Sequence, residues 1–117
     1  MDAEHLGRIV ETRVHRPEAI AEAAGRRKRR TRIVGPAGRL FVVAADHTAR
    51  GVLGAGADRD AMWDRATLLE RLCIALSRPG VDGVLGTADI VEDLLLLGAL
   101  DDKVVIGSMN RGGVQGA

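Results

Sequence analysis

Three short apolar runs, separated by segments of helical periodicity, are the clearest pattern in the sequence. The runs cover residues 40–46 (LFVVAAD), 81–86 (VDGVLG) and 103–109 (KVVIGSM), and turn-forming residues bound each of them. Runs of this length and composition are typical of buried strands. The order strand, helix, strand, helix, strand predicts right-handed βαβ units and therefore a parallel sheet.

The segments between these runs predict helices. After a Gly-rich loop, Asp58 is the expected N-cap of a helix of roughly twenty residues that ends before Pro79. Its apolar stripe repeats at spacings of four and three, through Met62, Ala66, Leu69, Cys73 and Leu76. A second helix is expected over 88–97, ended by Gly98. A weak pattern predicts a helix over 4–15, and Pro17 marks the start of a second, better-defined one. Together they form an N-terminal helical segment.

Composition narrows the class of protein. The chain has 117 residues, 46% hydrophobic and 28% charged, which fits one small domain and excludes a disordered chain. No apolar run is long enough to cross a membrane, and no apolar signal region begins the chain. The single cysteine excludes a disulfide framework and a multi-cysteine zinc site, and the three histidines are scattered. We therefore expect a cytoplasmic protein without a metal.

The charge is divided unevenly along the chain. Residues 1–39 carry a net charge of +5 and residues 40–117 a net charge of −4. Five adjacent cations, RRKRR at 26–30, would bind phosphates and leave a nucleic-acid-binding module as an alternative function. Because no aromatic residue is interleaved with them for base stacking, the sequence favours a solvated helix end.

Three parallel strands are an incomplete fold. They leave two unpaired edges, and two crossover helices cannot cover both faces of the sheet. We therefore expect residues 40–117 to be about three βα units of a partial (β/α)8 TIM barrel, preceded by the N-terminal helical segment 1–39 with its basic run. An open doubly wound sheet is the competing parent fold, and assembly with further copies is another way to cover the edges.

Ligands of such folds bind at the carboxyl ends of the strands, which selects the candidate site residues. Asp46 is the candidate for proton transfer, and the arginines of this set suit a phosphate or carboxylate. The alternative for Asp46 and its neighbour is simple capping of the loop. In chain order the candidates are Asp46, His47, Arg50, Thr87, Asp89, Ser108, Asn110 and Arg111.

Three motifs, AADHTARG, DGVLGTADI and GSMNRGGVQGA, lie at the ends of the predicted strands. Through them residues 41–117 resemble the first part of the deoxyribose-phosphate aldolase and LacD-like class I aldolases, most closely an actinobacterial branch often found with inositol-catabolism genes. The resemblance implies a (β/α)8 barrel that cleaves or forms a carbon–carbon bond in a sugar phosphate or related keto compound through a lysine Schiff base. It implies no cofactor. It also implies that Asp46 and His47 are catalytic, with Asp46 assisting proton transfer around the carbinolamine.

The Schiff-base lysine of that family belongs to a later strand. Here only Lys28 and Lys103 exist; the first lies in the basic run, and the second begins a strand at the end away from the site. Neither suits a buried amine nucleophile. We therefore expect this chain alone to be inactive and to need the remainder of the barrel, or self-association, to cover its strand edges.

Overall fold

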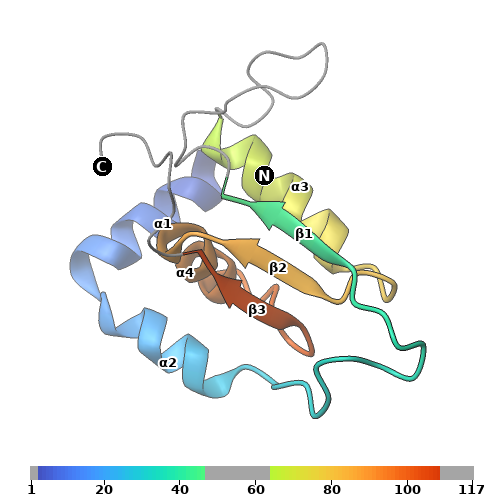
Figure 1. The fold of residues 1–117 in the computed structure, drawn as a ribbon. Coiled ribbons are helices and arrows are strands. Elements are labelled where there is room, and N and C mark those ends of the chain that lie inside the picture. Colours follow the sequence, from blue (N-terminus) through green and yellow to red (C-terminus); the bar gives the residue numbers. More distant parts are fainter. Residues whose placement is uncertain (1–2, 47–63, 109–117) are drawn as a thin grey trace.

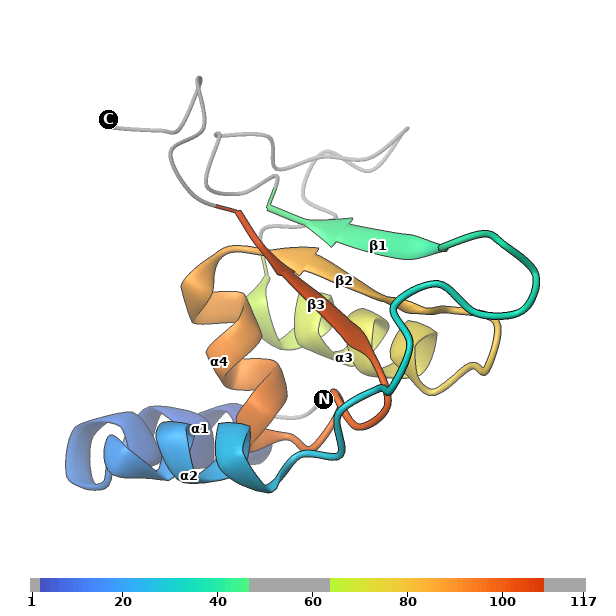
Figure 2. The ribbon, with the colours of Figure 1, turned by 60° about the horizontal axis from the view of Figure 1, so that its bottom comes forward.

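A parallel sheet with helices packed on one face forms the described part of the chain (Figures 1 and 2). It is known from a computed structural model, which describes residues 3–46 and 64–108. In chain order, the elements within these ranges are α1 (Ala3–His15), α2 (Glu18–Arg26), β1 (Val42–Ala45), α3 (Arg65–Leu76), β2 (Gly83–Gly86), α4 (Ala88–Leu96) and β3 (Val104–Gly107).

The sheet confirms the predicted parallel topology. Its strand order is β1-β2-β3, and both pairings are parallel. Val43 pairs with Val84, which pairs with Val105, so β-branched side chains form a continuous row across the sheet. Each strand is four residues long. It is shorter than the apolar run that predicted it, and the residues at the ends of each run lie outside the paired strand. All strands point the same way, so their carboxyl ends share one edge (Figure 1).

The core lies between the sheet and the helices. Helices α1 to α4 lie below the sheet in Figure 2. Val84 is fully buried there, and Val43 and Val105 pack against the same core. The neighbouring row, Ala44, Leu85 and Ile106, alternates to the other face, where Ile106 is 40% exposed. In the described part of the chain, burial of the apolar strands is therefore confirmed for one face of the sheet.

Helix α3 begins later than predicted. Asp64 is its N-cap, and the Asp64 carboxylate accepts a hydrogen bond of 3.2 Å from the Thr67 amide. The expected N-cap, Asp58, lies outside the described residues. Buried positions on this helix are Leu69, Leu72 and Leu76, while Cys73 is half-buried against the core. The predicted stripe is thus confirmed in its second half, with Leu72 added.

Helix α4 ends as the sequence predicts. Gly98 follows it with a φ of +71°, in the left-handed region that glycine adopts at low cost. The turn that leads into β3 holds Asp102 at a φ of 64°. Asp is one of the few side chains that tolerate this region.

The N-terminal helical segment shares the core with the sheet. Ile9 of α1 is buried in the same cluster as the sheet and α4, and Ala23 of α2 is buried as well. Helices α1 and α2 lie beside α4 in both views (Figures 1 and 2). None of the helices within 3–46 and 64–108 combines the length and apolar character needed to cross a membrane.

Candidate functional site

Asp46 and Ser108 meet at the carboxyl edge of the sheet. They follow the last paired row, in which Ala45 pairs with Gly86 and Gly86 with Gly107. The Asp46 residue is only 2% exposed, and the Ser108 hydroxyl donates a hydrogen bond of 3.1 Å to its Oδ2 atom. A buried carboxylate at this edge is the feature that the sequence predicts for proton transfer.

Thr87 follows β2, the strand between β1 and β3, but its hydroxyl does not bind Asp46 or Ser108. It occupies the N-cap position of α4 and donates to the Asp89 Oδ1 atom. The other oxygen of Asp89 accepts a hydrogen bond from the Arg65 guanidinium. Thr87 and Asp89 are therefore brought together as predicted, within a helix N-terminus. Their roles in substrate binding stay predictions.

The pKa of Asp89 lies below its ordinary value. Burial of the side chain opposes this shift, but the hydrogen bonds from Thr87 and Arg65 and the positive charge of Arg65 outweigh it. Asp89 is thus an ionised carboxylate in the first turn of α4, where its negative charge also interacts favourably with the helix dipole.

A cluster of ion pairs joins three helices beside this edge. Asp93 on α4 has a side chain only 5% exposed and lies between Arg13 of α1, at 2.7 Å, and Arg65 of α3, at 3.8 Å. Arg13 also donates to Glu92, at 3.1 Å, and to the Asp89 carbonyl, at 2.9 Å. Sequence reasoning missed this cluster. The partners are 80 residues apart in the Arg13–Asp93 pair, so no local spacing signals it.

Four predicted site residues, His47, Arg50, Asn110 and Arg111, lie outside the described residues. The structure therefore brings together Asp46 with Ser108, and Thr87 with Asp89. Among residues 3–46 and 64–108, no group of three or more His, Cys, Asp or Glu side chains is placed to hold a metal ion.

The basic run is bound to the opposite, amino-terminal edge of the sheet. Arg27 donates to the carbonyls of Leu100, at 3.2 Å, and Lys103, at 3.1 Å. Arg30 forms an ion pair of 2.9 Å with Asp82. The interpretation of 26–30 as a solvated helix end is wrong for these two side chains, because α2 ends at Arg26 and the chain then crosses the sheet edge.

Lys103 lies at the same amino-terminal edge, as its position in the sequence predicts. Its ammonium donates to the carbonyls of Val81, at 2.6 Å, and Arg78, at 3.1 Å, which lie in the loop between α3 and β2. The lysine therefore stabilises a connection between α3 and β2. It lies at the edge opposite Asp46 and Ser108.

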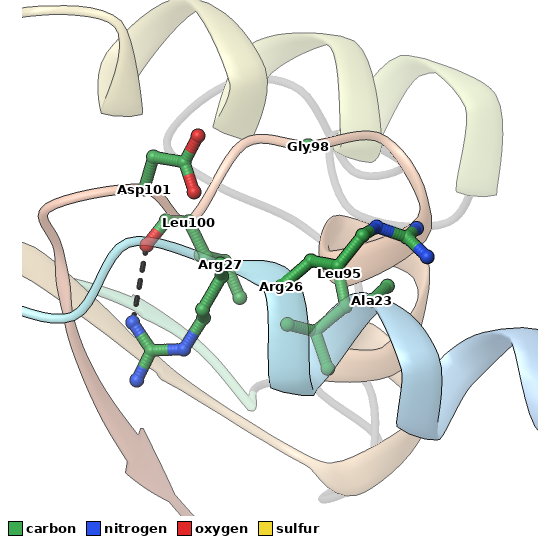
Figure 3. Close-up of a pocket in the computed structure, with 7 residues that line it drawn as sticks. All are labelled: Ala23, Arg26, Arg27, Leu95, Gly98, Leu100 and Asp101. Carbon is green, nitrogen blue, oxygen red and sulfur yellow. Dashed lines mark hydrogen bonds between the residues drawn. The ribbon is translucent and has the colours of Figure 1, made fainter.

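A cavity of about 270 Å³ lies between α2 and the loop before β3 (Figure 3). Ala23, Leu95 and Leu100 form its apolar lining. In Figure 3 the Arg27 guanidinium reaches the Leu100 carbonyl, while that of Arg26 points in another direction. Because the loop precedes β3, this cavity lies away from the carboxyl edge and adds nothing to the candidate site.

Comparisons with known proteins place the chain in a family. No curated protein matches it. Among solved structures it is similar to the crystal structure of Cgl0159 from Corynebacterium glutamicum (Brevibacterium flavum), with a TM-score of 0.88 and 53% sequence identity. The match covers 100% of this chain and 39% of that chain, so the present chain spans well under half the length of its relative. The model of the Cgl0159-like family matches residues 38–117, and the chain therefore belongs to the Cgl0159-like family.

Proposed function

We propose that this chain supplies the first βα units of a class I aldolase-type (β/α)8 barrel. The full-length protein would cleave or form a carbon–carbon bond in a sugar phosphate or related keto compound. One observation carries the proposal: Asp46, buried at the carboxyl end of β1, is held by a hydrogen bond from the end of β3. This is the edge at which TIM-barrel enzymes place their catalytic groups.

The arrangement of the sheet supports a barrel as the parent fold. Its strands are parallel and follow one another in sequence order, and the described helices all lie on one side of them. The length relation supports further units, because this chain covers 39% of the related chain and the rest of that chain is long enough to hold them. An open doubly wound sheet is the alternative, and it would add helices to the face that carries Ala44, Leu85 and Ile106.

In the proposed reaction, a lysine beyond residue 117 attacks the substrate carbonyl through its neutral amine and forms a carbinolamine, which loses water to give a Schiff base. Asp46 accepts and returns the protons that these steps move. No metal or organic cofactor enters this chemistry. Arg50 and Arg111 remain the proposed ligands of a substrate phosphate, and a cytoplasmic location follows from the proposed metabolism of a sugar phosphate.

The proposal also includes what covers the unpaired edges and the helix-free face of the sheet. β1 and β3 each pair only with β2 in the described part of the chain, and Ile106 is exposed on the helix-free face. Unpaired edges and an apolar face favour association with further strands. We propose the remainder of the barrel as this partner in the full-length protein, and self-association in the isolated chain.

Borohydride reduction tests the function. A full-length protein that contains this sequence is mixed with sugar phosphates and keto compounds, and the adduct is located by mass spectrometry. We expect a trapped adduct on a lysine beyond residue 117, and none on this chain alone. Absence of any adduct on the full-length protein would overturn the Schiff-base mechanism.

A matched pair of variants tests the role of Asp46. D46N removes the buried carboxylate, whereas D102N changes an exposed residue at the opposite edge in a backbone region that Asn also tolerates. We expect D46N to lower kcat about a hundredfold or more, and D102N to change it less than about twofold. Equal activities of the two variants would remove Asp46 from the mechanism.

The alternative function, a nucleic-acid-binding module, depends on the cations of the basic run that remain exposed. Arg26, Lys28 and Arg29 are exposed, whereas Arg27 and Arg30 are bound to the sheet edge. Salt-dependent retention on DNA or RNA that is lost in R26A/R29A would favour this alternative. Retention unchanged by these substitutions would exclude the run as the binding site.

A further inference from the structure

The end of β3 holds the carboxylate that follows β1, although β2 separates the two strands. The backbone of Ser108 first continues the sheet, because its amide donates a hydrogen bond of 2.8 Å to the Gly86 carbonyl. This bond fixes the Ser108 backbone relative to β2. The hydroxyl then spans the remaining distance to Asp46 Oδ2, at 3.1 Å.

Thr87, which follows β2 and stands between Asp46 and Ser108 across the sheet, does not compete for this hydrogen bond. Thr87 also carries a hydroxyl, but that hydroxyl donates to Asp89 within the first turn of α4. Of the three residues that follow the strands, Asp46 and Ser108 thus interact with each other, while Thr87 interacts with the helix. The Ser108 hydroxyl has one proton, and the bond to Asp46 uses it.

We infer that Ser108 is a positioning residue, which holds the Asp46 carboxylate in one orientation at the carboxyl edge of the sheet. This role differs from substrate binding, which the sequence predicts for Ser108. It rests on the proposed function only as far as Asp46 acts in proton transfer. A carboxylate that donates or accepts a proton must be held within hydrogen-bond reach of the reacting atom, and a fixed orientation supplies this condition.

The first experiment needs no enzymatic activity. The ¹³Cγ resonance of Asp46 and its χ1-dependent couplings are measured by NMR in the full 117-residue chain, for the wild type, S108A, S108C and S108T. We expect S108A and S108C to shift the resonance and to populate a second χ1 rotamer, because neither offers a hydroxyl donor. S108T, which keeps the hydroxyl, should resemble the wild type.

Controls keep this experiment decisive. S108C is nearly isosteric with serine, so it tests the hydrogen bond even where S108A fails to fold. Amide resonances of α2, which packs against α4, report whether the fold is intact. An Asp46 signal that is the same in S108C as in the wild type would overturn the inference.

The second experiment separates positioning from substrate binding in the full-length protein. A positioning role predicts that S108A lowers kcat about tenfold to a hundredfold with KM changed less than about twofold, and that S108T recovers most of the rate. A rise in KM with unchanged kcat would instead identify Ser108 as a substrate ligand. If the wild-type protein gives no borohydride-trapped adduct, the proposed function fails, while the NMR result still decides the role of Ser108.

Discussion

Gly83 has no room for a side chain. A Cβ atom added at this residue of β2 would lie 2.1 Å from the Val104 carbonyl oxygen, and backbone of the neighbouring strand cannot move aside cheaply. Gly107 of β3 is a matched control, because nothing lies within 4 Å of its added Cβ. We expect G83A to lower the free energy of unfolding by about 2–4 kcal/mol and G107A to change it by less than about 1 kcal/mol, measured by urea denaturation. Equal stabilities would contradict the close approach of β2 and β3.

Asp82 makes the amino-terminal edge sensitive to acid. The hydrogen bond from the Phe41 amide, followed by that from Arg30, holds the pKa of Asp82 below its ordinary value. A depressed pKa in the folded state contributes stability that is present above the unfolded-state pKa, about 3.9, and is lost as the pH falls through the lower folded-state value.

The matching variant is D82N, which removes the charge at nearly constant volume. We expect it to be less stable than the wild type at pH 7, and the difference to shrink as the pH falls below about 4. Denaturation curves at a series of pH values measure this difference. A difference that stays constant down to pH 2 would show that the ionised carboxylate contributes nothing beyond the amide.

At the scale of elements, Arg13 joins α1 to α4 through a carboxylate that is almost fully buried. Removing the guanidinium leaves Asp93 with Arg65 as its one remaining ion-pair partner in the described structure, at 3.8 Å. We expect R13A to lower the free energy of unfolding by about 3 kcal/mol. R16A, which breaks exposed pairs with Glu18 and Glu22, should cost less than about 1 kcal/mol. Similar costs for both variants would mean that burial of Asp93 does not strengthen its ion pair.

The elements show how far local sequence determines the fold. Strands, helices and the Gly98 cap were predictable, because hydrophobic periodicity and capping act within a few residues. The start of α3 was not predictable. Asp64 is the N-cap, and Asp58 offers the same capping chemistry, so the residue type alone does not select between them.

In the site as well, some contacts could be predicted from the sequence and others could not. The carboxyl ends of the strands could be predicted from topology, and with them the neighbourhood of Asp46 and Ser108. The contacts of Arg27 and Arg30 with the sheet edge could not, because a run of cations shows no partner in its own sequence. Sequence separation is not the reason, because Asp46 and Ser108 are 62 residues apart and Arg27 and Leu100 are 73 apart. Parallel topology brings strand ends to one edge, but it names no partner for a cation that precedes the first strand.

At the scale of the whole molecule, the helix-free face of the sheet has different surroundings in the isolated chain and in a closed barrel. Ile106 is 40% exposed on this face, and a barrel would bury it among the side chains of the other strands. Ile74 on α3 is 51% exposed and lies on the helical layer, which stays outside in a barrel. A charge at residue 106 should therefore act differently in the isolated chain and in the full-length protein, whereas a charge at residue 74 should matter little in either.

We expect I106K to reduce self-association of the isolated chain, measured by sedimentation, because a charge on the face opposes apolar contact between copies. In the full-length protein the same substitution should lower the free energy of unfolding by about 3 kcal/mol or more, since it places an unpaired charge in a packed interior. I74K should change either property little. If I106K leaves the full-length protein as stable as I74K does, the face is open to solvent there as well, and the sheet is not part of a closed barrel.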